Sequence, residues 1–171
     1  MIKIEEIKPG SKRIDCWNLF PDPGCGESIH NGGYVWERSY DSARQLKDMA
    51  SMPGYDKDAV MQALKEGPST PQGAAGATEK KPDEQYERWT FYGTCDADDL
   101  EQHGLSVEDE TPKASAMVVI INDRIVKCSL NVLDTGEFPY DVLAWQRKPG
   151  SPWGVGVSRQ IRTVQRMLNG A

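Results

Sequence analysis

The stretch from residue 116 to residue 133 constrains the fold most, because it consists of two strand-forming runs around a two-residue turn. Residues 116–121 are apolar and mostly β-branched, and residues 124–133 continue with a similar run. Asn122 and Asp123 lie between them, and both residue types tolerate the positive φ of a tight hairpin turn. The pattern predicts an antiparallel hairpin, and therefore a fold built on a sheet.

Four further segments have the composition of strands. Residues 34–40 alternate large apolar and polar side chains, which is typical of a half-buried strand, and residues 86–95 are dense in aromatic residues. Residues 17–24 predict a short strand that ends in a Pro-Asp-Pro turn, and residues 140–146 predict another strand.

Two short helices are predicted between the strands. Asp41 or Ser42 is expected to cap the first and Asp56 the second, and Gly67 with Pro68 ends the pair. The inward faces are expected to carry apolar residues at helical spacing, namely Ala43, Leu46, Met49, Ala50, Val60, Met61 and Leu64.

A last helix is predicted within residues 155–169, where five apolar residues form one stripe: Val157, Ile161, Val164, Met167 and Leu168. The predicted fold class is therefore α+β, with an antiparallel sheet of four to six strands, a short helical pair and a C-terminal helix. Residues 67–84 contain no large apolar residue, so a flexible surface loop is expected there, inside one domain that spans residues 1–171.

The charge is distributed unevenly along the chain. The sequence has 20 Lys and Arg against 26 Asp and Glu, a net charge of −6. Five of the basic residues and none of the acidic ones lie from Arg147 onward, so residues 1–146 carry 15 basic and 26 acidic groups, or −11. An acidic body argues against strong non-specific binding of DNA, whose affinity depends on neutralised phosphates, but it suits DNA that passes without sticking.

Neither a membrane span nor a secretion signal is predicted, because no long apolar run occurs and residues 1–8 lack an apolar stretch. We therefore expect the protein to be made in a cytoplasm. The cysteines are Cys16, Cys25, Cys95 and Cys128, and with no CxxC pair they are expected to be free thiols. A zinc site at Cys16, Cys25 and His30 remains the alternative, although the spacing matches no usual zinc finger.

No pattern of catalytic residues is evident. The two histidines, His30 and His103, lie in loops without a nucleophile motif, and the Gly154-Val155-Gly156 run lacks the spacing of a nucleotide-binding loop. The acidic residues within 96–110 leave one alternative, a metal-dependent nucleic-acid-processing enzyme, because phosphodiester chemistry uses carboxylate-held metals. We expect a solvated acidic loop there, no cofactor and no enzymatic activity.

The remaining candidates are interaction residues. Trp36, Trp89 and Trp145 lie in predicted strands and are expected to pack in the core, whereas Trp17 and Trp153 lie in Pro- and Gly-rich loops and are candidates for an interface. The final helix carries further candidates that share one face, for contact with an acidic neighbour or DNA: Arg159, Arg162 and Arg166.

Residues 138–169, with their Gly154-Val155-Gly156 entry into a helix that contains Gln165 and Asn169, resemble the middle of bacteriophage portal proteins. The phrase at 17–23, the stretch at 30–38 and the segment ARQLKDMA at 43–50 are similar to earlier parts of that family, in the same order. The resemblance spans about residues 12–169. Family members are several times longer, so the resemblance implies a wing-region fragment that ends at the start of the stem-leading helix.

The resemblance also implies a function. Portal proteins form a ring, typically of about twelve subunits, at one vertex of the viral capsid. The ring docks the packaging terminase, binds tail adaptors and capsid proteins, and lets DNA pass without sequence-specific binding. A structural virion protein made in the cytoplasm of the bacterial host is therefore expected.

Overall fold

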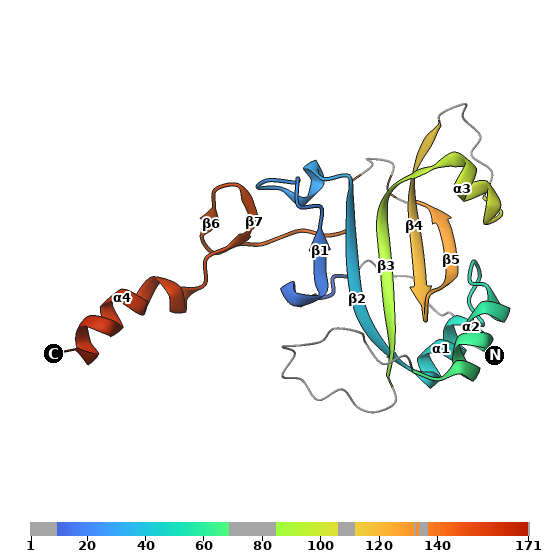
Figure 1. Cartoon of the computed structure of the whole chain (residues 1–171), viewed down its shortest axis with the longest axis horizontal. Helices are drawn as coiled ribbons and strands as arrows, with labels where there is room; N and C mark the ends of the chain where they lie inside the picture. Colours follow the sequence, from blue (N-terminus) through green and yellow to red (C-terminus); the bar gives the residue numbers. More distant parts are fainter. Residues whose placement is uncertain (1–9, 69–84, 106–111, 132, 134–136, 171) are drawn as a thin grey trace.

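A five-stranded antiparallel sheet organises the chain, with the strands in the order β1-β2-β3-β4-β5 (Figure 1). The computed structural model describes residues 10–68, 85–105, 112–131, 133 and 137–170. The strands of this sheet are β1 (Leu19–Pro21), β2 (Tyr34–Ser42), β3 (Gln85–Asp96), β4 (Lys113–Ile121) and β5 (Arg124–Leu130). The order follows the chain, so the sheet is a meander in which every pairing joins consecutive strands.

Within the described residues, four α-helices and two short 3₁₀ helices accompany the sheet. The α-helices are α1 (Ala43–Met49), α2 (Lys57–Glu66), α3 (Ala97–Gln102) and α4 (Val157–Asn169), and the 3₁₀ helices are Cys16–Asn18 and Ile29–Asn31. A second, two-stranded sheet pairs β6 (Arg147–Lys148) with β7 (Ser151–Gly154). The predicted α+β class, the antiparallel sheet, the helical pair and the C-terminal helix are all confirmed.

The predicted β4–β5 hairpin forms around its two-residue turn. Asn122 and Asp123 have φ values of 51° and 59°, the conformation that this tight turn needs. The Asn122 side chain donates hydrogen bonds to the carbonyl oxygens of Ala63 (3.3 Å) and Gly67 (2.8 Å). The turn is thereby tied to the end of α2. Strand β5 ends at Leu130, earlier than the predicted run to residue 133.

The helical pair begins at the predicted caps. The Ser42 hydroxyl accepts a hydrogen bond from the Gln45 backbone N–H, and the Gln45 side chain accepts one from the Ser42 N–H at 2.7 Å. This reciprocal arrangement is a capping box. The Asp56 carboxylate accepts hydrogen bonds from the N–H groups of Asp58 and Ala59 and caps α2 without a reciprocal bond. The start of each helix is thus decided by local sequence.

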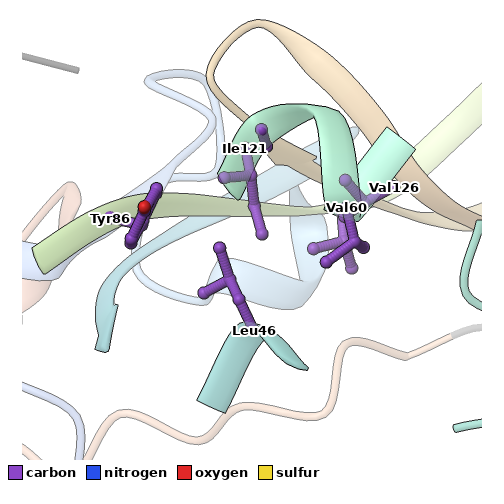
Figure 2. Packing of buried hydrophobic residues seen from close by; sticks show 7 residues of the cluster. Leu46, Val60, Tyr86, Ile121 and Val126 are labelled. Atoms are coloured by element: carbon purple, nitrogen blue, oxygen red, sulfur yellow. The ribbon is translucent and has the colours of Figure 1, made fainter. Parts of the chain in front are cut away.

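The pair packs on one face of the sheet and forms the main buried cluster (Figure 2). Its side chains come from α1, α2 and strands β3 to β5: Leu46, Val60, Ala63, Tyr86, Val119, Ile121 and Val126. The predicted inward position of Met61 is wrong, because its side chain is 39% exposed and Ala63 is buried in its place. A helix that lies flat on a sheet needs small residues where it comes closest, and Ala63 provides this.

A second buried cluster lies on the same face, nearer β1. It contains Leu19, Ile29, Val35, Phe138 and Tyr140. The strand predicted at residues 140–146 does not form. Its apolar alternation is real, because Tyr140 is buried and Val142 packs against the cluster, but this backbone pairs with no strand in the described residues.

The core position predicted for Trp145 is also wrong, since that side chain is 87% exposed. The chain there leads into the β6–β7 hairpin, which the sequence patterns did not predict. Pro149-Gly150 forms its turn, and Gly150 has the positive φ (70°) that a Pro-Gly turn requires at its glycine. The Pro149-Gly150 dipeptide is the sequence feature from which this turn could have been predicted.

Helix α4 projects away from the body of the molecule, beyond the β6–β7 hairpin (Figure 1). Every residue of α4 is exposed, so its predicted apolar stripe packs on neither buried cluster. No helix in the described part of the chain is both long and apolar enough to cross a membrane. Of the predicted flexible loop at 67–84, residues 69–84 lie outside the described residues.

The main cluster leads to a stability prediction. Leu46 is completely buried, so Leu46→Ala should remove the packing of α1 and lower the free energy of unfolding by about 2–5 kcal/mol. Denaturant titration monitored by circular dichroism measures this. The control Lys47→Ala, at the exposed neighbouring position, should change stability by less than about 0.5 kcal/mol. Equal effects of the two substitutions would contradict the packing described.

Candidate interaction surfaces

A line of exposed apolar side chains runs along α4. Its exposed fractions are 55% for Val157, 51% for Ile161, 59% for Val164 and 75% for Leu168. Met167, at the edge of the stripe, is 70% exposed. Apolar residues scattered singly on a surface are ordinary, but an aligned set on one helix marks a contact site. The sequence predicted the stripe, and only the structure shows that it is uncovered.

The three candidate arginines also lie on α4, on the side opposite to this stripe. Arg159, Arg162 and Arg166 are all exposed. With 3.6 residues per turn, they lie about half a turn from the line through Ile161 and Val164. The helix is therefore strongly two-sided, and a partner that covers the apolar side leaves the basic side facing outward.

The two tryptophans predicted at an interface have different surroundings. Trp17 is 79% exposed, beside β1, and its carbonyl oxygen accepts a hydrogen bond from Arg38 at 3.4 Å. Trp153 is half-buried against the second cluster and lines a groove of about 570 Å³. The groove runs between β1, the turn around Asp22 and the β6–β7 hairpin. The two residues do not belong to one surface patch, so they remain separate candidates.

Asp22 lines this groove and holds the turn beside it. Its carboxylate accepts hydrogen bonds from the N–H groups of Gly24 (2.8 Å) and Gly33 (2.9 Å). These hydrogen bonds keep the pKa of Asp22 below its usual value. Their partners are backbone groups of the same loop, so the carboxylate has a structural role in the turn.

The face of the sheet opposite to α1 and α2 carries a group of aromatic side chains. Phe20, Trp36, Trp89 and Phe91 lie on β1, β2 and β3, at positions that alternate with the buried ones. Ring centroids are 5.4 Å apart for Phe20 and Trp89 and 4.8 Å apart for Trp36 and Phe91. We call this group the aromatic face. Trp36 and Trp89 therefore pack with each other, in neither of the two buried clusters.

Arg38 lies across the aromatic face. Its guanidinium carbon is 5.5 Å from the Phe20 ring centroid and 5.9 Å from that of Trp89, both within cation–π range. The ion pair between Arg38 and Glu87 is long, at 4.0 Å. Beside it, a shallow hollow of about 330 Å³ is lined by Phe20, Trp36, Trp89, Ile120 and Asp123. An apolar hollow of this kind can take a side chain of a partner.

A buried ion pair lies on the covered face, between the two clusters. The Asp41 Oδ2 and Arg88 Nε atoms are 2.9 Å apart, and the same Nε donates a hydrogen bond to the Ser39 hydroxyl at 3.0 Å. Asp41 is only 5% exposed. Burial raises the pKa of its carboxyl group, and the nearby Arg88 only partly offsets this.

Next to this pair, the Tyr140 hydroxyl donates a hydrogen bond to Glu37 at 2.7 Å. Burial, and then this bond to a carboxylate, raise the pKa of Tyr140 well above its usual range. Lys12 lies 3.8 Å from the other oxygen of Glu37. Perturbed groups gather at functional sites in many proteins, but each group here is held by a partner inside the fold, and none of them lines the groove or the hollow described above. We interpret them as a structural network.

Only part of the acidic segment at residues 96–110 lies within the described residues. Asp98, Asp99 and Glu101 are exposed as expected, but they lie on the short helix α3 and not in a loop, whereas residues 106–111 lie outside the description. His103 is exposed after this helix, and His30 stacks on Phe138. Within the described residues, no group of three or more His, Cys, Asp and Glu side chains could hold a metal ion.

Sequence patterns missed the buried ion pair and the position of the aromatic face. The available signal was the parity of the residues: Asp41 shares odd positions with Val35 on β2, whereas Trp36 falls on even ones. Parity separates the two faces of a strand but does not say which face is covered. Comparison with protein-family models and with curated proteins gave no match to this chain.

The buried pair leads to a pH prediction. Arg88→Met leaves the Asp41 carboxylate buried without its cation, so the free energy of unfolding should fall by about 3–5 kcal/mol near pH 7. Without Arg88 the folded-state pKa of Asp41 rises further, while the unfolded chain keeps the ordinary value of 3.8. Between the unfolded-state and folded-state pKa values, the Asp41 carboxyl group is protonated in the folded state but not in the unfolded chain. The free energy of unfolding therefore falls as the pH rises through this range.

The loss caused by Arg88→Met should therefore be smaller at about pH 4 than at about pH 7, measured by urea denaturation against the unchanged chain. Adding Asp41→Asn should restore part of the lost stability at pH 7, because no buried charge is then left unpaired. A loss that is the same at both pH values, with no recovery in the double variant, would show that the pair does not act as described.

Proposed function

We propose that this chain is a structural protein that works by assembly, as part of a portal ring at a viral capsid vertex. The observation that carries the proposal is α4, an amphipathic helix whose exposed apolar stripe packs on neither of the buried clusters that the other described elements form. Such a helix gains stability by packing against another chain. The resemblance of residues 138–169 to portal proteins supports the specific role.

The distribution of charge supports the same role. Residues 1–146 carry a net charge of −11, and all five basic groups after them lie in the β6–β7 hairpin and α4. An acidic body repels DNA, so a duplex that moves past it does not adhere. In this proposal, contacts between subunits form the ring, and terminase, tail adaptors and capsid proteins bind the assembled ring.

Electron microscopy of the complete reading frame that contains these residues is the test. Negative-stain images should show rings with a central hole, in preparations purified without other viral proteins. A homogeneous monomer that stays monomeric at high concentration would overturn the proposal, because a portal works only as a ring.

The alternative, a metal-dependent enzyme acting on nucleic acids, has its own test. Plasmid DNA incubated with the chain and Mg²⁺ or Mn²⁺ should remain intact on a gel, because Asp98 and Asp99 lie exposed on α3 without a described metal cluster. Cleavage that disappears in the Asp98→Ala, Asp99→Ala double variant would support the enzyme and contradict the proposal.

A further inference from the structure

The apolar stripe of α4 has the spacing of a helix–helix seam. Val157, Ile161, Val164 and Leu168 follow one another at intervals of four, three and four residues. This is the alternation of the d and a positions in a heptad repeat, which places the four side chains on one narrow line. In heptad terms Ile161 and Leu168 are a positions, and Val157 and Val164 are d positions.

The width of the stripe indicates what kind of surface covers it. Helix α2, which packs on the sheet, has a wider apolar face made of Ala59, Val60, Ala63 and Leu64, two adjacent pairs one turn apart. A strict line of a and d residues is the narrower pattern by which one helix packs against another. The seam of α4 therefore fits a helix better than it fits the aromatic face of a neighbouring sheet.

The residues beside the seam indicate which kind of helix packs against α4. The positions beside the seam are Ser158, Gln160, Gln165 and Met167, none of which is charged. The arginines occupy the outer positions, far from the seam. Charged residues beside a seam choose partners of opposite charge and repel identical helices. With neutral flanks, two copies of α4 meet no repulsion along the line of contact.

Helix α4 also needs a partner for its own stability. It has 13 residues, all exposed, and Gly156 at its N-cap makes no side-chain capping hydrogen bond. Its first turn holds no acidic residue that would favour the helix dipole. Helices shorter than about 12–15 residues are marginal in water, and the β-branched Val157, Ile161 and Val164 lower the propensity further.

We propose that α4 packs along its Val157–Leu168 seam against α4 of other copies of this chain, forming a short helical bundle. Val residues at both d positions disfavour a parallel two-stranded pair, so parallel copies of α4 are expected to form a bundle of more than two helices. The arginines then form the outer surface of the bundle. This contact goes beyond the proposed function, since it requires no capsid, DNA or ring of fixed size.

The test compares two aspartate substitutions one residue apart in the full 171-residue chain. Val164→Asp puts a charge in the seam, and Thr163→Asp puts the same charge at an exposed outer position. In analytical ultracentrifugation over a range of concentrations, the unchanged chain and Thr163→Asp should form the same oligomer. Val164→Asp should weaken association about tenfold or more, because a charge cannot be buried in the seam.

Unfolding is not a competing explanation for these results. The residues of α4 belong to neither buried cluster, so both variants should keep the denaturation midpoint of the body when measured as dilute monomers. Monomers of the unchanged chain at high concentration would overturn the proposal. So would equal weakening by Thr163→Asp and Val164→Asp.

A photo-reactive amino acid at Ile161 identifies the contact directly. In a mixture of isotopically light and heavy chains, cross-linked peptides should join α4 of a light copy to α4 of a heavy copy. Cross-links to the aromatic face, or only within one copy, would overturn the proposal. Rings formed by the complete reading frame that persist with Val164→Asp would leave the portal proposal standing and remove this contact. Cross-links between α4 helices without rings would support this contact and contradict the portal proposal.

Discussion

The pairing of β2 with β3 is the contact on which the rest of the structure depends. Nine residue pairs, from Tyr34 with Gly93 to Ser42 with Gln85, join two strands that are separated in sequence by residues 43–84. Closing so long a loop costs chain entropy before any contact is gained. The β2–β3 ladder that results lies at the centre of the sheet, where β1 pairs with β2 and the β4–β5 hairpin pairs with β3.

The register of this ladder sorts the side chains of both strands. It places Asp41 and Arg88 on the covered face and Trp36 and Trp89 on the opposite one. A slip of one residue would reverse every side chain. A buried ion pair contributes little net stability compared with apolar residues, but a wrong register would leave both charges without partners. We interpret the pair as a determinant of register between two clusters that apolar packing alone would align loosely.

The two uncovered surfaces follow from this arrangement. Helices α1 and α2 occupy one face of the sheet, and the Asn122 hydrogen bonds tie the end of α2 to the β4–β5 turn. The aromatic face is left half-exposed, and α4 lies beyond the β6–β7 hairpin, away from both clusters (Figure 1). The described elements therefore complete both buried clusters without using the amphipathic helix α4.

The elements that the sequence predicted correctly are those decided by neighbouring residues. The Asn122-Asp123 turn and the caps at Ser42 and Asp56 each depend on contacts within a few residues. The errors at Met61 and Trp145 both concern which way an apolar residue points. Periodicity cannot decide this, because it depends on what lies across the interface.

By itself, the sequence determined the α+β class, the order of most elements, the acidic body and the two-sided character of α4, because spacing and composition carry that information directly. Only the tertiary structure decided that Tyr140 and Val142 pack on the second cluster without strand pairing and that Asp41 meets Arg88. It alone also left the seam of α4 uncovered. The physical reason is that burial belongs to pairs of surfaces, and a sequence pattern describes only one surface of each pair.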